Sequence, residues 1–144
     1  MDFHLRPCAT AVKALLAAAA LPTEDLRAEH FEHFIACGPE DSPDAVVGLE
    51  LYGEVALLRS LVVAAAARDK GYGSSLVAQA EAYAGQRGVQ EIYLLTTTAE
   101  AFFRQLGYAS CTRADAPAAI RQTAEFSSLC PANSAFMRKR IEAR

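Results

Sequence analysis

Two apolar runs that are separated by a short glycine-containing turn constrain the fold more than any other feature. Residues Ala45–Tyr52 and Val55–Val63 both read as strands, and Gly53 lies between them as the turn residue. The second run is apolar in both of its alternations, which is typical of a strand that is covered on both faces. The pattern therefore predicts a hairpin whose second strand lies in the middle of a sheet.

The rest of the chain alternates further strands with short helices. The patterns predict strands over Asp2–Arg6, Phe31–Cys37, Val89–Thr96, Tyr108–Thr112 and Ala135–Ile141, and helices over Thr10–Ala20, Glu24–Glu29, Ser74–Gln86, Ala99–Leu106 and Pro117–Thr123. Thr97 and Glu100 have the spacing of a capping box for the fourth helix. Without a repeat or a linker, 144 residues predict one mixed α/β domain over 1–144.

Charge and hydropathy exclude two classes of partner. The net charge is −3 and no basic stripe is present, whereas a protein that binds nucleic acid needs one. The longest apolar run, Ala14–Leu21, has eight residues, far short of the ~18 that a membrane span requires. No basic and apolar leader opens the chain, so a cytoplasmic location is expected.

Cysteine and histidine spacing gives no sign of a metal site. The four cysteines, Cys8, Cys37, Cys111 and Cys130, contain no C-x-x-C pair, so reduced thiols are expected. His30 and His33 are three residues apart on a predicted strand, where such residues face opposite sides. No bound metal is therefore expected.

The segment Arg68-x-x-Gly71-x-Gly73 carries the chemistry, because it joins the central strand to a helix. Glycine allows a tight turn and a close approach to a ligand. The first amides of the following helix have no intrahelical partners, which predicts an anion cradle. The Walker pattern is excluded because no lysine follows Gly73, and the Rossmann pattern lacks its third glycine.

Together with its flanks, this segment resembles the GNAT superfamily of N-acetyltransferases. That superfamily has Q/R-x-x-G-x-G/A after a strand that ends in L-x-V, which here reads Leu61-Val62-Val63. The stretch Phe102–Tyr108 is similar to the superfamily's helix ending, typically F-Y-x-x-L-G-F. A closer resemblance, to small acetyltransferases associated with arsenic-resistance operons, rests on the segments Gly48–Glu50, Ala56–Leu61, Tyr93–Thr98 and Phe126–Pro131.

The resemblance implies a fold and a co-substrate. The fold is a central, mostly antiparallel sheet, splayed between the strands Val55–Val63 and Val89–Thr96 and flanked by helices. Acetyl-CoA is the implied co-substrate, and a neutral amine of a small molecule attacks its thioester directly. The backbone N–H near Val62 is the implied oxyanion donor. The implied cofactor contacts are Leu61, Val62, Val63, Arg68, Asp69, Lys70, Gly71, Tyr72, Gly73 and Ser74.

Three polar residues near the implied site are candidates for the remaining roles. Glu50 lies in an apolar strand and is the candidate base for the amine, although an edge carboxylate facing water fits the pattern equally well. Arg59 is a cation in the central strand, so it either pairs with a partner such as Glu50 or binds an anionic group of the substrate. Thr96 is a candidate substrate contact.

The residue pattern leaves the general acid and two other function classes open. Phe103 occupies the position where many superfamily members carry a tyrosine acid, and Tyr108 is expected to pack. The chain therefore also fits a non-catalytic module that binds acyl-CoA, or a thiol-based arsenical binder that uses Cys130. The sequence leaves a homodimer open as well.

Overall fold

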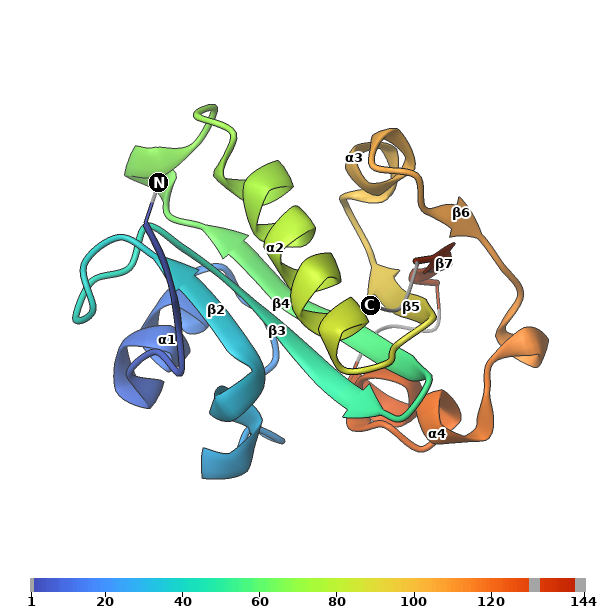
Figure 1. Cartoon of the computed structure of the whole chain (residues 1–144). Helices are drawn as coiled ribbons and strands as arrows, with labels where there is room; N and C mark the ends of the chain where they lie inside the picture. Colours follow the sequence, from blue (N-terminus) through green and yellow to red (C-terminus); the bar gives the residue numbers. More distant parts are fainter. Residues whose placement is uncertain (1, 130–132, 142–144) are drawn as a thin grey trace. The chain divides into compact units, whose positions relative to one another are not determined.

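The computed structural model describes residues 2–129 and 133–141. The chain forms two compact units, Met1–Glu50 with Leu58–Tyr83 and Leu51–Leu57 with Ala84–Arg144. Seven strands form one sheet in the order β1-β2-β3-β4-β5-β7-β6 (Figure 1). Strand β4 contributes residues to both units, which are described in turn.

The first unit is built on antiparallel strands. Strand β1 (Phe3–Leu5) pairs with β2 (Phe34–Cys37), and β2 pairs with β3 (Ala45–Tyr52). Strand β4 (Val55–Val63) follows β3 in the sheet order. The end of β4 is fixed to the start of β3 by the backbone bond from the Ala64 N–H to the Asp44 carbonyl, 2.7 Å.

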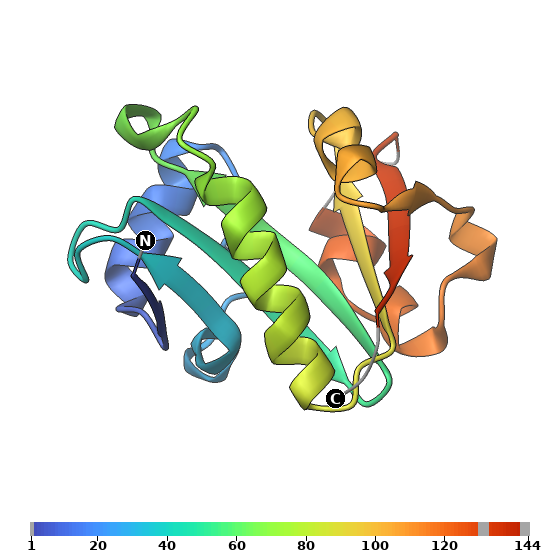
Figure 2. The same ribbon diagram turned by 45° about the horizontal axis from the view of Figure 1, so that its top comes forward.

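Helices cover both faces of these strands. Helix α1 (Ala9–Ala18) lies on one face and α2 (Tyr72–Gln86) on the other (Figure 2). The core on the α1 side is apolar and is completed by the 3₁₀ helix η1 (Ala28–His33). Its members are Val12, Leu16, Leu26, Phe31, Phe34, Ala36, Val46 and Val62.

The second unit contains the parallel pair of the sheet. Strand β4 pairs with β5 (Glu91–Thr96) over Val55–Leu57. Strand β5 pairs antiparallel with β7 (Ala135–Arg140), which pairs with β6 (Ala109–Ser110). The described residues of the unit also form the short helical segments α3 (Glu100–Gln105), η3 (Arg113–Asp115), α4 (Ala118–Arg121) and the π-helical η4 (Glu125–Leu129). Its core contains Leu57, Tyr93, Ala116, Ile120 and Phe136.

The fold class inferred from the sequence is confirmed. The sheet is mostly antiparallel with one parallel pair and is flanked by helices. The bounds of β3 and β4 agree with the predicted hairpin, because their apolar patterns are long and bounded by turn residues. No helix in residues 2–129 or 133–141 has the length and hydropathy needed to cross a membrane.

The predicted helix Glu24–Glu29 is wrong. That segment forms a turn that leads into the 3₁₀ helix η1, which also takes the first three residues of the predicted strand Phe31–Cys37. Leu26 and Phe31 both lie in the apolar core on the α1 side, so tertiary packing and not local helix propensity decides the conformation here. His30 and His33 consequently lie on one short helix and not on a strand.

The predicted capping box is also wrong. Helix α3 begins after its N-cap residue, Ala99, whose side chain makes no capping hydrogen bond. The Ala99 N–H instead donates to the hydroxyl of Thr96, 3.0 Å. Thr96 rather than Thr97 therefore holds the turn between β5 and α3.

Candidate functional site

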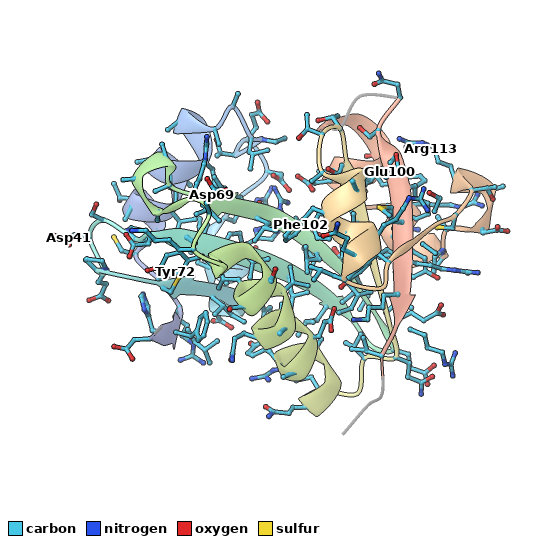
Figure 3. The ribbon with its side chains drawn as sticks, turned by 90° about the horizontal axis from the view of Figure 1, so that it is seen from above. Asp41, Asp69, Tyr72, Glu100, Phe102 and Arg113 are labelled. Atoms are coloured by element: carbon cyan, nitrogen blue, oxygen red, sulfur yellow. The ribbon has the colours of Figure 1, made fainter. Side chains whose placement is uncertain are left out.

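The loop between β4 and α2 contains the glycine motif. A short 3₁₀ turn, η2 (Ala65–Ala67), follows β4. Asp69 and Gly71 then take left-handed backbone conformations, with φ of 65° and 82°. Figure 3 shows Asp69 in the loop and Tyr72, the first residue of α2 (Tyr72–Gln86). The two left-handed residues turn the chain sharply into the helix; Gly71 is one of the two motif glycines, whereas Asp69 is not a glycine and its left-handed conformation was not predicted.

Helix α2 begins earlier than the sequence pattern predicted. It starts at Tyr72 rather than at Ser74, and the Ser75 N–H donates to the Gly71 carbonyl, 3.2 Å. Tyr72 and Gly73 therefore belong to the first turn, whose amides have no partner inside the helix and face the loop. The Arg68 Nε lies 3.5 Å from the Val63 carbonyl and donates to it, so the motif's first residue contacts the end of β4.

Strand β4 contains an irregularity just before this loop. Ser60 has a left-handed φ of 59°, which is rare for a residue other than glycine in a strand. Arg59 contacts Asp25, and Val62 belongs to the same core cluster as Leu26, so both side chains lie on the α1 side of the strand. Residues three apart face opposite sides of a regular strand, and Ser60 therefore resets the alternation in the way a β-bulge does.

A charged cluster around Arg59 lies on the α1 side of β4, next to this irregularity. The Arg59 Nη1 donates to the Glu50 Oε2, 2.8 Å, and the Arg59 Nη2 donates to the Asp25 Oδ1, 3.0 Å. Nη1 also donates to the second oxygen of Asp25, and Nε donates to the Ser60 hydroxyl, 3.1 Å. Arg59 is 3% exposed and Glu50 is 8% exposed. The predicted pair of Arg59 with Glu50 is therefore present, and Asp25 joins it.

The charges of this cluster shift the protonation of Asp25. Burial raises the pKa of the Asp25 carboxyl, but the hydrogen bond and the charge of Arg59 together outweigh it, so the pKa lies below its ordinary value. Asp25 is consequently ionised at neutral pH. The buried guanidinium thus lies between two carboxylates and is not left without a counter-charge.

His30 lies beside the cluster and completes a set of groups that resembles a cation site. One ligand atom each of Asp25, His30 and Glu50 lies within 4.8 Å of the others. The Arg27 N–H donates to the His30 Nδ1, 2.9 Å, so that nitrogen is an acceptor. Arg59 already supplies positive charge between the two carboxylates, and the set reads as an ion-pair network.

The other candidate residues belong to the second unit. Thr96 accepts the Ala99 N–H and therefore has a local structural role. Phe103 is 4% exposed and meets the Tyr108 ring edge to face, with centroids 5.6 Å apart. Tyr108 is 2% exposed, so it packs as the sequence predicted.

Asp25 and His30 are the residues of this site that the sequence pattern missed. Asp25 lies in an acidic stretch that resembles the first turn of a helix, 34 residues before Arg59. The signal that pointed toward it is Arg59 itself, because a buried guanidinium needs a counter-charge. The sequence analysis named Glu50 as the candidate partner and did not include Asp25.

The family comparison agrees with the arrangement of β4, loop and α2. A model of the acetyltransferase (GNAT) family matches residues 7–108. An uncharacterised N-acetyltransferase of Chlorobaculum tepidum is 33% identical over 81 residues, which are 56% of this chain and 52% of that protein. The chain thus spans about half the length of this relative.

Solved structures share the fold at low sequence identity. The N-acetylglutamate synthase of Neisseria gonorrhoeae, solved with coenzyme A and N-acetyl-glutamate, superposes with a TM-score of 0.80 at 16% identity. The match covers 98% of this chain and 35% of the synthase. A Mycobacterium tuberculosis protein solved with CoA has a TM-score of 0.79 at 18% identity, with 98% and 99% of the two chains covered.

Proposed function

The chain belongs to the GNAT family of acetyltransferases, and we propose on this basis that it transfers an acetyl group from acetyl-CoA to the primary amine of a small molecule. The observation that carries the proposal is the loop between β4 and α2, with left-handed residues at Asp69 and Gly71 and the first amides of α2 behind them. A pyrophosphate fits such a cradle of backbone N–H groups.

The end of β4 and the loop are the proposed binding surface for acetyl-CoA. The backbone of Leu61, Val62 and Val63 would pair with the amide groups of the pantetheine arm, as an added strand does. The segment Arg68–Ser74 would hold the pyrophosphate. The contact of Arg68 with the Val63 carbonyl supports this proposal, because it links the loop to the strand end.

The proposed chemistry is a direct transfer. The neutral amine nitrogen attacks the thioester carbon, the C–S bond breaks, and coenzyme A leaves as a thiolate. The backbone N–H of Val62 would donate to the developing oxyanion. The thiolate, with a pKa near ~8.5, needs little help from an acid, which agrees with a phenylalanine at position 103.

Glu50 is the proposed base that accepts the proton from the attacking amine. Its carboxylate is 8% exposed and lies 2.8 Å from Arg59, so its position is fixed. Arg59 and Thr96 remain proposed substrate contacts. An anionic acceptor that binds Arg59 would have to share the guanidinium with Asp25 and Glu50.

Release of the free thiol from acetyl-CoA tests the proposal, with a panel of neutral amines and acidic amino acids as acceptors. The panel includes arsenic and phosphorus analogues of the acidic amino acids, because the arsenic-resistance setting is also proposed from sequence resemblance. We expect turnover with at least one acceptor and a loss of about two decades or more in Glu50→Gln, the scale of general base catalysis. Glu54→Gln is the matched control, since Glu54 lies exposed in the β3–β4 turn.

A non-catalytic module that binds acyl-CoA is the alternative favoured by the buried Phe103. It predicts saturable CoA binding with no thiol release from any acceptor. The thiol-based arsenical binder has less support among the described residues, because burial raises the pKa of Cys37 and of Cys111 and thiolates are the ligands. Cys130, the thiol singled out by the sequence, lies outside the described residues. Arsenite titration of Cys130→Ser tests this alternative.

A further inference from the structure

Two carboxylates contact the single guanidinium of Arg59. Among the described residues of this cluster, the carboxylates of Asp25 and Glu50 face one guanidinium. His30 is the other titratable group within reach of both carboxylates. An ion pair between Arg59 and Glu50 alone would already balance the buried charge, so the second carboxylate needs a separate explanation.

Asp25 is held firmly in place. The Thr23 carbonyl accepts the Leu26 N–H, 3.0 Å, which closes a turn around Asp25. Leu26 is buried in the core under α1, and the Arg27 N–H is bound to the His30 ring. This turn directs both oxygens of Asp25 to the two terminal nitrogens of Arg59. The geometry is the bidentate arrangement in which a carboxylate binds a guanidinium best.

The electrostatic consequence concerns Glu50. A guanidinium at 2.8 Å favours the charged form of a carboxylate and so weakens it as a base. A second carboxylate on the same guanidinium opposes that effect, because its negative charge disfavours the charged form of the neighbouring carboxylate. Burial strengthens both effects, since Arg59 and Glu50 are almost fully shielded from water.

Resting on the proposed function, we propose that Asp25 is a positioning residue that orients and neutralises Arg59, so that Glu50 keeps the basicity needed to take a proton from the acceptor amine. Asp25 acts through Arg59 and does not itself contact the reacting atoms. Arg59 in turn fixes the Glu50 carboxylate in place.

Asp25→Asn removes the charge with little change in shape and tests this role. Glu50 then faces an unbalanced guanidinium, so its carboxyl should take up a proton at a pH about one unit lower than in the wild type, a tenfold loss of proton affinity. The acidic limb of the turnover profile should move to lower pH by the same amount. Turnover on the plateau should fall about tenfold, while KM for acetyl-CoA stays unchanged.

The measurement that does not depend on activity is carbon NMR of glutamate labelled at the side-chain carboxyl. Glu50 is assigned by the signal that Glu50→Gln loses, and its protonation midpoint is read from a pH titration. Asp25→Glu, which keeps the charge, should retain the wild-type midpoint. Asp41→Asn is the matched control, because Asp41 lies exposed in the β2–β3 loop (Figure 3).

Two outcomes would overturn the inference. One is an unchanged Glu50 midpoint in folded Asp25→Asn, even if turnover is lost. The other is a wild-type turnover profile in a variant whose midpoint has moved. If Asp25→Asn does not fold, two other variants replace it. One is Arg59→Met alone, and the other combines Arg59→Met with Asp25→Asn. The midpoint should rise in the single variant and return toward the wild-type value in the double variant.

A failure of the proposed function is distinguishable from these results. A wild-type protein that releases no thiol with any acceptor contradicts the acetyltransferase activity. The NMR titration of Asp25→Asn in that same protein still decides whether Asp25 controls the basicity of Glu50.

Discussion

The ring of Phe34 fills the space that a side chain at Gly48 would need. The two residues are direct partners in the β2–β3 pair, and a Cβ built on Gly48 would lie 2.5 Å from the ring. Gly48 thus leaves room for the fully buried ring of Phe34 to lie against β3. Glu50 follows two residues later in this strand and is on the same face. The packing of this face and the position of the candidate base are therefore linked.

Gly48→Ala should destabilise the protein by about 1–3 kcal/mol, the usual cost of overpacking a core. Urea unfolding measures the change in the free energy of unfolding. Phe34→Leu makes room, so the double variant should lose less stability than the sum of the two single losses. Additive losses would show that the ring does not oppose the added methyl group.

Acetyl-CoA should raise the melting temperature by roughly 5–10 °C at a concentration about 100-fold above Kd, because it binds only the folded state. Gly71→Leu should abolish this shift, since a side chain at a φ of 82° strains the loop and crowds its amides. Gly88→Leu is the control, because Gly88 has a φ of 87° with no atom within 4 Å of an added Cβ. It should lower the melting temperature but keep the shift.

The stability that Asp25 contributes should depend on pH. A carboxyl whose pKa is lowered in the folded state stabilises the fold above its ordinary value of 3.8, and this contribution is lost as the pH falls through the folded pKa. Asp25→Asn should therefore cost about 1–3 kcal/mol at pH 7, less than a fully buried pair because the side chain is 16% exposed. The difference from the wild type should shrink between about pH 4 and pH 2.

Urea unfolding at several pH values measures that difference. Asp41→Asn should differ little from the wild type at every pH, because its side chain is exposed. A constant difference between Asp25→Asn and the wild type across the acid range would contradict the role of the Arg59 ion pair.

Tyr108→Phe should change turnover by less than about tenfold, because the Tyr108 ring is buried against Phe103 and Lys139 lies over it. Its main effect should be on stability, from the loss of the hydroxyl group. Phe103→Tyr should leave the rate similar or slightly higher. A loss of more than about two decades in Tyr108→Phe would identify Tyr108 as the general acid.

The sequence by itself determined the central hairpin, the fold class and the glycine loop. Strands β3 and β4 have the predicted bounds because long apolar runs bounded by turn residues are strong local signals. The loop followed from its glycines, and the structure shows the left-handed backbone that Gly71 permits. Arg59 stood out because a charge inside an apolar strand requires a partner.

Only the tertiary structure showed that Asp25 joins Glu50 as a partner of Arg59, and how the strand presents the guanidinium. Asp25 lies 34 residues from Arg59, and an ion pair over that distance leaves no periodic trace in the sequence. The left-handed Ser60 turns Arg59 and Val62 to the same face, against the alternation that a pattern assumes. The turn before η1 replaced a predicted helix because burying Leu26 and Phe31 together outweighs local helix propensity.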